Sequence, residues 1–199
     1  MDLAALVALR RDIHQHPELG YQEHRTSALV VEFLTRLGLE VHQGIGKTGV
    51  VGVLKRGSST RTVGLRADMD ALPMADNGSQ PWKSRQPDVC HACGHDGHTV
   101  MLLGAAQALA AESSFDGTVC FIFQPAEEGL AGAQAMIDDG LFTRFPCDAV
   151  YAIHNWPQLP LGTVQTRAGP IMAAGDAFSI TVEGGGGHAA QPQLTADTP

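Results

Sequence analysis

The run Thr118–Phe123 constrains the fold most, because it is almost continuously apolar. A strand that alternates apolar and polar residues leaves one face in water, whereas a continuously apolar strand is buried on both faces. Segments with helical apolar spacing lie before and after this run along the chain. The sequence therefore predicts an α/β sheet with helices over both of its faces.

Apolar spacing, together with glycine and proline breaks, predicts the other elements. Helical spacing covers residues 3–13 and 29–37, with Pro17 and Gly20 between the two patterns and Gly38 closing the second. Further elements are expected as helices at about 97–111 and 131–139, as strands at 49–54, 62–67, 149–153 and 177–183, and as a long polar loop at 73–93. Loops of that length in compact domains are usually functional or disordered.

The charge and hydropathy patterns argue against two classes of partner. The 199 residues include 13 Lys and Arg against 21 Asp and Glu, a formal net charge of −8, which does not favour polynucleotide binding. No apolar run approaches the ~20 residues that cross a bilayer. The short run Leu3–Leu9 precedes Arg10 and Arg11, the reverse of a secretory signal. We expect a cytoplasmic protein without nucleic-acid or membrane partners, whose four cysteines stay thiols.

Two motifs match known signatures without their full context. Gly44–Gly49 has the spacing of a dinucleotide fingerprint, but a predicted strand follows it, and the fingerprint needs a helix N-terminus for the pyrophosphate. Cys90 and Cys93 have C-x-x-C spacing, and Gly94 stands where haem attachment requires histidine. A thiol redox pair at these two cysteines stays open as an alternative.

The densest chemistry lies in Cys90–His98, which holds two thiols, three imidazoles and a carboxylate. In an extended segment residues i and i+2 face the same way, so Cys93 and His95 are predicted to converge. Thiolate and imidazole together bind zinc, nickel, cobalt or manganese. A structural or reactive cysteine among surface histidines is an equally good interpretation of this cluster alone.

Glu127 and Glu128 follow shortly after the strand predicted at 118–123. Catalytic groups in open α/β sheets gather at the carboxyl ends of strands. Two carboxylates in one small site raise each other's pKa, unless a cation lies beside them. One carboxylate could then coordinate a metal while the other accepts a proton from water. For an isolated Glu-Glu pair, an ordinary charged turn is the alternative.

Other polar side chains also follow predicted strands. His154 comes directly after the strand at 149–153, and Asp68 and Asp70 come directly after the strand at 62–67. Each could be a solvated loop residue by itself. Their shared position at strand ends, together with the two clusters above, favours one common site.

The chain resembles the amidohydrolase branch of the aminoacylase/carboxypeptidase metallopeptidases, which includes the hippurate hydrolases and the indoleacetyl-amino-acid hydrolases. The resemblance rests on the order and spacing of five motifs and covers essentially the whole chain. The motifs are Arg11–Gly20, Arg66–Pro73, His91–His98, Gln124–Gly129 and Gly186–Pro192.

This resemblance implies a hydrolase that cleaves the amide of a small N-acyl amino acid with two divalent metal ions, which could be zinc, manganese, cobalt or nickel. It implies Glu127 as the general base. The implied metal ligands are Cys93, His95, Glu128 and His154.

Three further residues take roles from the same resemblance. Asp70 matches the supporting aspartate of the family's metal motif, and Asp68 stands where other branches place a ligand histidine. His188 matches a histidine of the lid domain that contacts the substrate, often across a dimer. The resemblance thus implies a homodimer or larger homo-oligomer for the full-length form.

The implied fold is a three-layer α/β/α catalytic domain with an inserted α+β lid or dimerisation domain. We assign residues 1–174 to the catalytic domain and residues 175–199 to the beginning of the lid. Family members continue through the lid and back into the catalytic domain, where a late histidine ligand lies. The chain is therefore expected to be an N-terminal portion, and a truncated, inactive metal-binding or interaction module is a further alternative.

Overall fold

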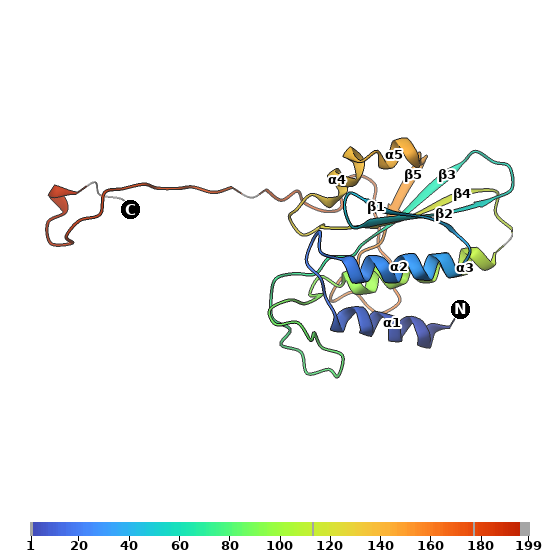
Figure 1. The fold of residues 1–199 in the computed structure, drawn as a ribbon, viewed down its shortest axis with the longest axis horizontal. Helices are drawn as coiled ribbons and strands as arrows, with labels where there is room; N and C mark the ends of the chain where they lie inside the picture. The colour runs from blue at the N-terminus through green and yellow to red at the C-terminus, as the bar shows by residue number, and fades with distance from the viewer. Residues whose placement is uncertain (1, 113, 177, 196–199) are drawn as a thin grey trace. The chain divides into compact units, whose positions relative to one another are not determined.

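The computed structural model describes residues 2–112, 114–176 and 178–195 and divides into two compact units between Pro157 and Gln158. Among these described residues, all α-helices and all strands belong to the first unit (Figure 1). The helices are α1 (Leu3–Gln15), α2 (His24–Arg36), α3 (His95–Ala111), α4 (Gly132–Asp138) and α5 (Leu141–Arg144). The strands are β1 (Glu40–Ile45), β2 (Gly49–Arg56), β3 (Thr62–Asp68), β4 (Gly117–Gln124) and β5 (Ala149–Ala152).

The five strands form one mixed sheet in the order β1-β2-β4-β3-β5. Strand β3 runs parallel to both β4 and β5, while β2 is antiparallel to β4 and β1 is antiparallel to β2. Asp68 at the end of β3 pairs with Gln124 at the end of β4. Because these three strands are parallel, the segments that follow β3, β4 and β5 all begin at the carboxyl ends of the strands, on the same side of the sheet.

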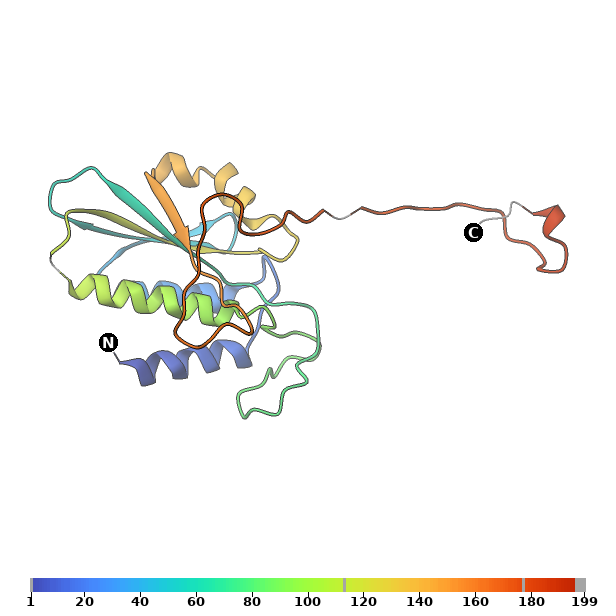
Figure 2. The same ribbon diagram turned by 180° about the vertical axis from the view of Figure 1, so that it is seen from behind.

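Helices cover both faces of this sheet, as the two opposite views show (Figures 1 and 2). On one face, Val30 and Leu34 of α2 and Leu103 of α3 pack against Phe121 and Phe123 of β4. The other face packs Ile122 of β4 against residues of α4 and α5. Helix α1 contacts α3 on the side away from the sheet. The predicted α/β architecture with helices over both faces is confirmed.

The apolar pattern of the sequence did not predict two of the elements, β1 and α5. Strand β1 is an edge strand whose residues are mostly exposed or half-buried, so it carries no continuous apolar run. Helix α5 has only four residues, too few to show a helical period. The polar stretch 73–93 contains no helix or strand, only an isolated bridge between Leu72 and Cys90, as predicted for a loop.

The second unit, residues 158–199, has one short 3-10 turn at Pro192–Leu194 and no other regular element among its described residues. The strand expected at 177–183 is therefore not found at residues 178–183, and Ala177 lies outside the described residues. A strand needs a neighbour to satisfy its backbone groups, and no described segment pairs with this one. The expected domain division after residue 174 stays a prediction.

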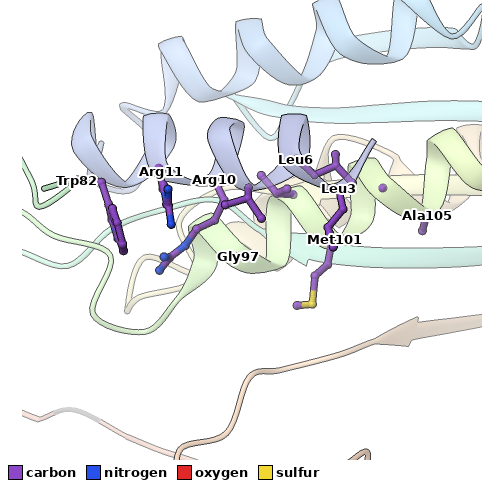
Figure 3. Close-up of a pocket in the computed structure, with 11 residues that line it drawn as sticks. Leu3, Leu6, Arg10, Arg11, Trp82, Gly97, Met101 and Ala105 are labelled. Atoms are coloured by element: carbon purple, nitrogen blue, oxygen red, sulfur yellow. The ribbon is translucent and has the colours of Figure 1, made fainter. Parts of the chain in front are cut away.

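An apolar groove of about 520 Å³ lies between α1 and α3 (Figure 3). Leu3 and Leu6 line one side of it, Val100 and Met101 line the other, and Trp82 closes one end. None of its lining residues carries a carboxylate, a thiol or an imidazole. The groove is therefore separate from the polar groups at the strand ends. Among the described helices, none has both the length and the apolar character to span a bilayer.

Candidate metal centre

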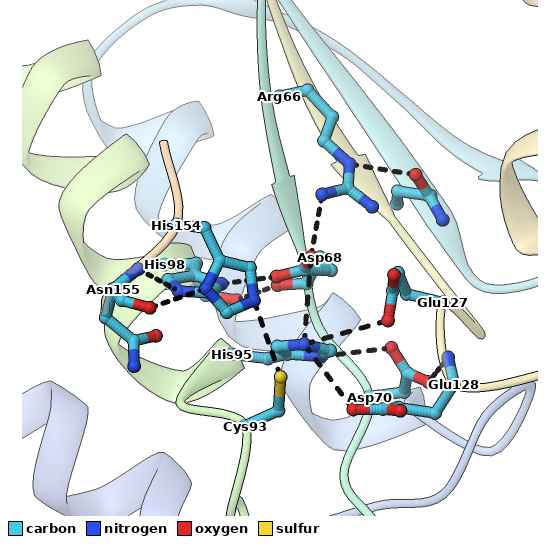
Figure 4. Close-up of polar contacts among 12 residues, drawn as sticks. Arg66, Asp68, Asp70, Cys93, His95, His98, Glu127, Glu128, His154 and Asn155 are labelled. Atoms are coloured by element: carbon cyan, nitrogen blue, oxygen red, sulfur yellow. Dashed lines mark hydrogen bonds and ion pairs between the residues drawn. The ribbon is translucent and has the colours of Figure 1, made fainter. Parts of the chain in front are cut away.

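His95, the first residue of α3, lies at the centre of a polar cluster (Figure 4). Its side chain is fully buried, and it belongs to three groups of potential metal ligands whose donor atoms lie within 4.8 Å of one another. The other members of these groups are Cys93 with His154, Glu127 with Glu128, and Asp68 with His98. The end of β3, the start of α3 and the segments after β4 and β5 thus supply thiol, imidazole and carboxylate donors to one place.

The two ring nitrogens of His95 face different carboxylates. Nε2 lies 3.8 Å from Glu128 Oε1 and 3.9 Å from Glu127 Oε2, while Nδ1 lies 3.3 Å from Asp70 Oδ1. Burial lowers the pKa of His95, but the carboxylates of Asp70 and Asp68 outweigh it and raise the pKa overall. The ring therefore sits in a strongly negative environment.

The donor atoms of this cluster fit a bound cation. Both nitrogens of His95 and Oδ1 of Asp70 are buried without a well-aligned hydrogen bond to any described residue. Buried polar atoms without a partner are rare in folded proteins. A divalent ion beside Nε2 would satisfy that nitrogen and offset the charge of Glu127 and Glu128, and the mixed thiol, imidazole and carboxylate donors suit zinc or a similar metal.

Cys93 and His154 form the outer side of the cluster. Cys93 Sγ lies 3.4 Å from His154 Nε2, and His154 Nδ1 donates to the Asn155 carbonyl oxygen at 2.6 Å. Burial and the Glu128 carboxylate raise the pKa of the Cys93 thiol to about 12. Without a cation the thiol is therefore protonated, the opposite of a reactive redox cysteine.

Asp68 is held from two sides. His98 Nδ1 donates to Asp68 Oδ1 at 2.6 Å, and Arg66 Nη1 donates to Asp68 Oδ2 at 2.7 Å. Burial raises the pKa of Asp68, but the His98 hydrogen bond and the Arg66 charge outweigh it and hold the pKa well below normal. His98 Nε2 accepts the Asn155 amide at 3.0 Å, so both nitrogens of this ring are already used.

His98 and Arg66 are therefore neighbours of the cluster to which sequence reasoning gave no role. His98 links the end of β3 to the segment after β5, and it packs edge-on against His154 with ring centroids 4.5 Å apart. Both residues lie within the quoted motifs, but only the folded sheet shows what they bind. Spacing along the chain gave no signal for these contacts.

Asp70 lies next to both His95 and Glu128 (Figure 4). Its Oδ2 accepts the Glu128 amide at 2.9 Å while Oδ1 faces His95. Burial raises the pKa of Asp70, but the His95 ring and the backbone amides of Glu128 and Glu127 outweigh it and lower the pKa. Carboxylates in this position commonly orient a ligand histidine.

The turn at Gly94 brings Cys93 and His95 together. Gly94 has a φ of 86°, in the left-handed region that favours glycine, and α3 begins at the next residue. The prediction of an extended segment here is wrong, while the expected helix is found and begins at His95 rather than at about residue 97. The two donors converge because the chain turns sharply into the helix, and not because they alternate along a strand.

His188 belongs to the second unit, where its Nδ1 accepts the Ala190 amide at 3.2 Å. The other predicted site residues all belong to the first unit. The expected substrate-binding role of His188 therefore stays a prediction.

Comparisons with known proteins find named hydrolases among the relatives of this chain. Over 189 residues the chain is 50% identical to hippurate hydrolase of Campylobacter jejuni subsp. jejuni serotype O:2, covering 95% of this chain and 49% of that protein. It is 45% identical over 193 residues to IAA-amino acid hydrolase ILR1-like 4 of Arabidopsis thaliana, covering 96% of this chain and 43% of that protein. The chain thus spans about half the length of these relatives.

A solved structure has a closely similar fold. The YXEP protein of Bacillus subtilis, described as a dinuclear metal binding peptidase from the M20 family, matches with a TM-score of 0.80 at 38% identity. The match covers 84% of this chain and 47% of that one. Residues 64–199 match the model of peptidase family M20/M25/M40. Since this match covers more than half of the sequence, the chain belongs to peptidase family M20/M25/M40.

Proposed function

We propose that the chain forms part of a metal-dependent amidohydrolase that cleaves the amide bond of small N-acyl amino acids. The observation that carries the proposal is the buried His95 ring, whose partnerless Nε2 faces Glu127 and Glu128. Hippurate is itself an N-acylated glycine, so the name of the relative from Campylobacter jejuni supports this substrate class. The dinuclear character of the Bacillus subtilis YXEP protein supports two metal ions.

In this proposal Cys93, His95, Glu128 and His154 hold two divalent ions, whether zinc, manganese, cobalt or nickel. When bound, such ions polarise the scissile carbonyl and lower the pKa of water toward 7. Asp70 is a positioning residue here, because it contacts both His95 and the Glu128 amide. A thiol ligand fits the reducing conditions of the cytoplasm.

The two glutamates take different parts because their exposure differs. The Glu127 side chain is 42% exposed, whereas the Glu128 side chain is 25% exposed. The backbone amide of Glu128 also donates a hydrogen bond to Asp70. Glu128 is therefore the better fixed ligand, and Glu127 is free to meet a substrate. Glu127 accepts a proton from the attacking water and passes it to the leaving amine nitrogen. His188 contacts the substrate, in a homodimer or larger homo-oligomer of the full-length protein.

Paired variants test these roles. Glu127→Gln is expected to lower hippurate hydrolysis by about 100- to 10,000-fold, the usual contribution of a general base, with metal content unchanged. Glu128→Gln is expected to lower metal content, because it removes a ligand. Amino acid release is measured with added manganese, cobalt or zinc, and metal content by elemental analysis of protein purified without chelators. Retained turnover in Glu127→Gln would rule it out as the base.

The same measurements separate the other interpretations. Full metal content without turnover in the unaltered chain would favour a non-catalytic metal-binding module. Less than one equivalent of metal, unchanged in Cys93→Ala, would contradict the hydrolase and favour a thiol redox protein. The high pKa of the Cys93 thiol argues against that last function, because redox cysteines have lowered pKa values.

A further inference from the structure

A buried carboxyl group outside the metal centre contacts the loop that carries Glu127 and Glu128. We propose that Glu23 is a positioning residue, which fixes the backbone at Ala126 and thereby aims both glutamates at the metal centre. This inference rests on the proposed function, since it assigns Glu127 and Glu128 the roles given above. It adds a residue from the segment between α1 and α2 to the machinery.

Glu23 is fully buried, although its side chain ends in a carboxyl group. Its Oε1 accepts the Ala126 amide at 2.8 Å, and its Oε2 lies 2.5 Å from the donating hydroxyl of Thr48. The interactions that lower its pKa are hydrogen bonds, and burial outweighs them and raises the pKa. Burying a carboxyl group with no cation beside it costs free energy. What the buried Glu23 contributes to the fold is therefore its hydrogen bonds to Ala126 and Thr48.

Ala126 is a position where the backbone needs such a restraint. It is fully buried and has a φ of 50°, in the left-handed region that L residues rarely adopt. Residues in such conformations persist only when their surroundings hold them there, and they cluster at functional sites. Ala126 immediately precedes Glu127, so a change in its backbone angles would redirect both glutamate side chains.

Two neighbours of Glu23 contact the same loop. The Tyr21 hydroxyl donates to the Leu130 carbonyl at 2.8 Å. At Gly20 a Cβ atom would lie 3.0 Å from both Cα and Cβ of Ala126, so the absence of a side chain permits this close approach. On the other side of the loop, Asp70 accepts the Glu128 amide. The loop is therefore held between two buried carboxyl groups, Glu23 and Asp70.

The test compares Glu23→Met with Glu23→Gln. Methionine fills a similar volume without accepting the Ala126 amide, whereas the glutamine carbonyl accepts it and the glutamine amide donates to Thr48. Two quantities are measured on the whole chain: hydrogen-exchange protection of the Ala126 and Glu128 amides by NMR, and Co²⁺ affinity by titration. Glu23→Met is expected to lose protection at Ala126 and to bind Co²⁺ about 10- to 100-fold more weakly. Glu23→Gln is expected to keep both the protection at Ala126 and the Co²⁺ affinity of the unaltered chain.

Val30→Ala is the control for lost stability, because Val30 is fully buried in the core between α2 and the sheet. It is expected to leave Co²⁺ affinity unchanged despite the cavity it creates. Where Glu23→Met does not fold, Glu23→Asp withdraws the carboxyl by one methylene and is expected to weaken Co²⁺ binding in the same direction. Unchanged amide protection and affinity in Glu23→Met, or in Glu23→Asp where it takes its place, would overturn the inference, and so would equal weakening in Val30→Ala.

Neither measurement depends on turnover, so the two proposals fail separately. A chain that binds Co²⁺ and responds to Glu23→Met, yet releases no amino acid from hippurate, contradicts the proposed activity and leaves the positioning role supported. A chain that hydrolyses hippurate at the same kcat and KM in the unaltered form and in Glu23→Met contradicts the positioning role alone.

Discussion

Glu23 and Asp70 are buried carboxyl groups on opposite sides of one loop, and their pKa values shift in opposite directions. The pKa of Asp70 is lowered, because the His95 ring and two backbone amides outweigh the effect of burial. The pKa of Glu23 is raised, because burial outweighs its hydrogen bonds. The difference follows from the neighbours of each group, and it suits Asp70 to a site that holds cations.

The raised pKa of Glu23 predicts a specific pH dependence of stability. Its folded pKa lies above the unfolded value of about 4.5, so its contribution is fully present below pH ~4.5 and is lost as the pH rises through the folded pKa. Glu23→Gln cannot ionise and removes this loss. The free energy of unfolding of the variant, relative to that of the unaltered chain, should therefore increase from pH 4.5 to pH 8 in urea titrations. A difference that is constant with pH would contradict the prediction.

At the scale of single residues, the sequence pointed to the cluster but not to its supports. Potential metal-ligating side chains near strand ends or a helix start can be recognised in the sequence. They are Cys93, His95, Glu127 and Glu128. Glu23 does not stand out, since its partner Ala126 is 103 positions away and offers only a backbone amide. Such a contact leaves no periodic or compositional trace in the sequence.

At the scale of elements, the first turn of α3 combines structural and chemical roles. Asp96 is fully buried there, where Arg10 Nε lies 2.7 Å and His14 Nδ1 lies 2.8 Å from its Oδ2. Both partners lie on α1, so the Asp96 carboxylate stabilises the packing of α1 against α3. An acidic residue in the first turn also interacts favourably with the helix dipole.

Two glycines at this helix start are predicted to respond in opposite ways to alanine. Gly94→Ala would place a Cβ in a left-handed backbone and 2.5 Å from Asn155 Oδ1, so a loss of at least about 1 kcal/mol is expected. Gly97 is helical and a Cβ there meets nothing within 4 Å, so Gly97→Ala should gain about 0.5–1 kcal/mol. Urea denaturation measures both, and a stabilised Gly94→Ala would contradict the geometry.

Elements with an apolar run or period were predictable, including the short β5 and α4, whereas the polar β1 and the four-residue α5 were not. Strands β2, β3 and β4 follow from their apolar runs, whereas β1 contains Glu40 and Gln43 at exposed positions. The start of α3 was missed because Gly94, Asp96 and Gly97 have low helix propensity. Tertiary contacts of Asp96 with α1 outweigh that local preference.

At the scale of the whole molecule, the proposed ligands connect segments that lie far apart in the sequence. Cys93 and His95 precede or begin α3, Glu128 follows β4 and His154 follows β5. A bound ion would hold these segments together, and it binds the folded chain only. The site is therefore coupled to the stability of the whole first unit.

Metal addition should accordingly raise the free energy of unfolding. At a free Co²⁺ concentration of about 1,000 times Kd, mass action predicts a gain of about 4 kcal/mol at each independent site. The gain should disappear with EDTA and be smaller in Glu128→Gln at the same Co²⁺ concentration. Urea titrations with and without Co²⁺ provide the measurement, and equal midpoints in the unaltered chain would contradict the proposed site.

The two edges of the sheet differ in how well they resist added strands. At one edge, β1 has a shift in register between Gln43 and Ile45 and exposes polar side chains, both of which discourage pairing. At the other, β5 exposes Val150 and Tyr151 and pairs on only one side within the described chain. Because β5 has unpaired backbone groups on its outer side, it is the edge at which this sheet would accept an added strand.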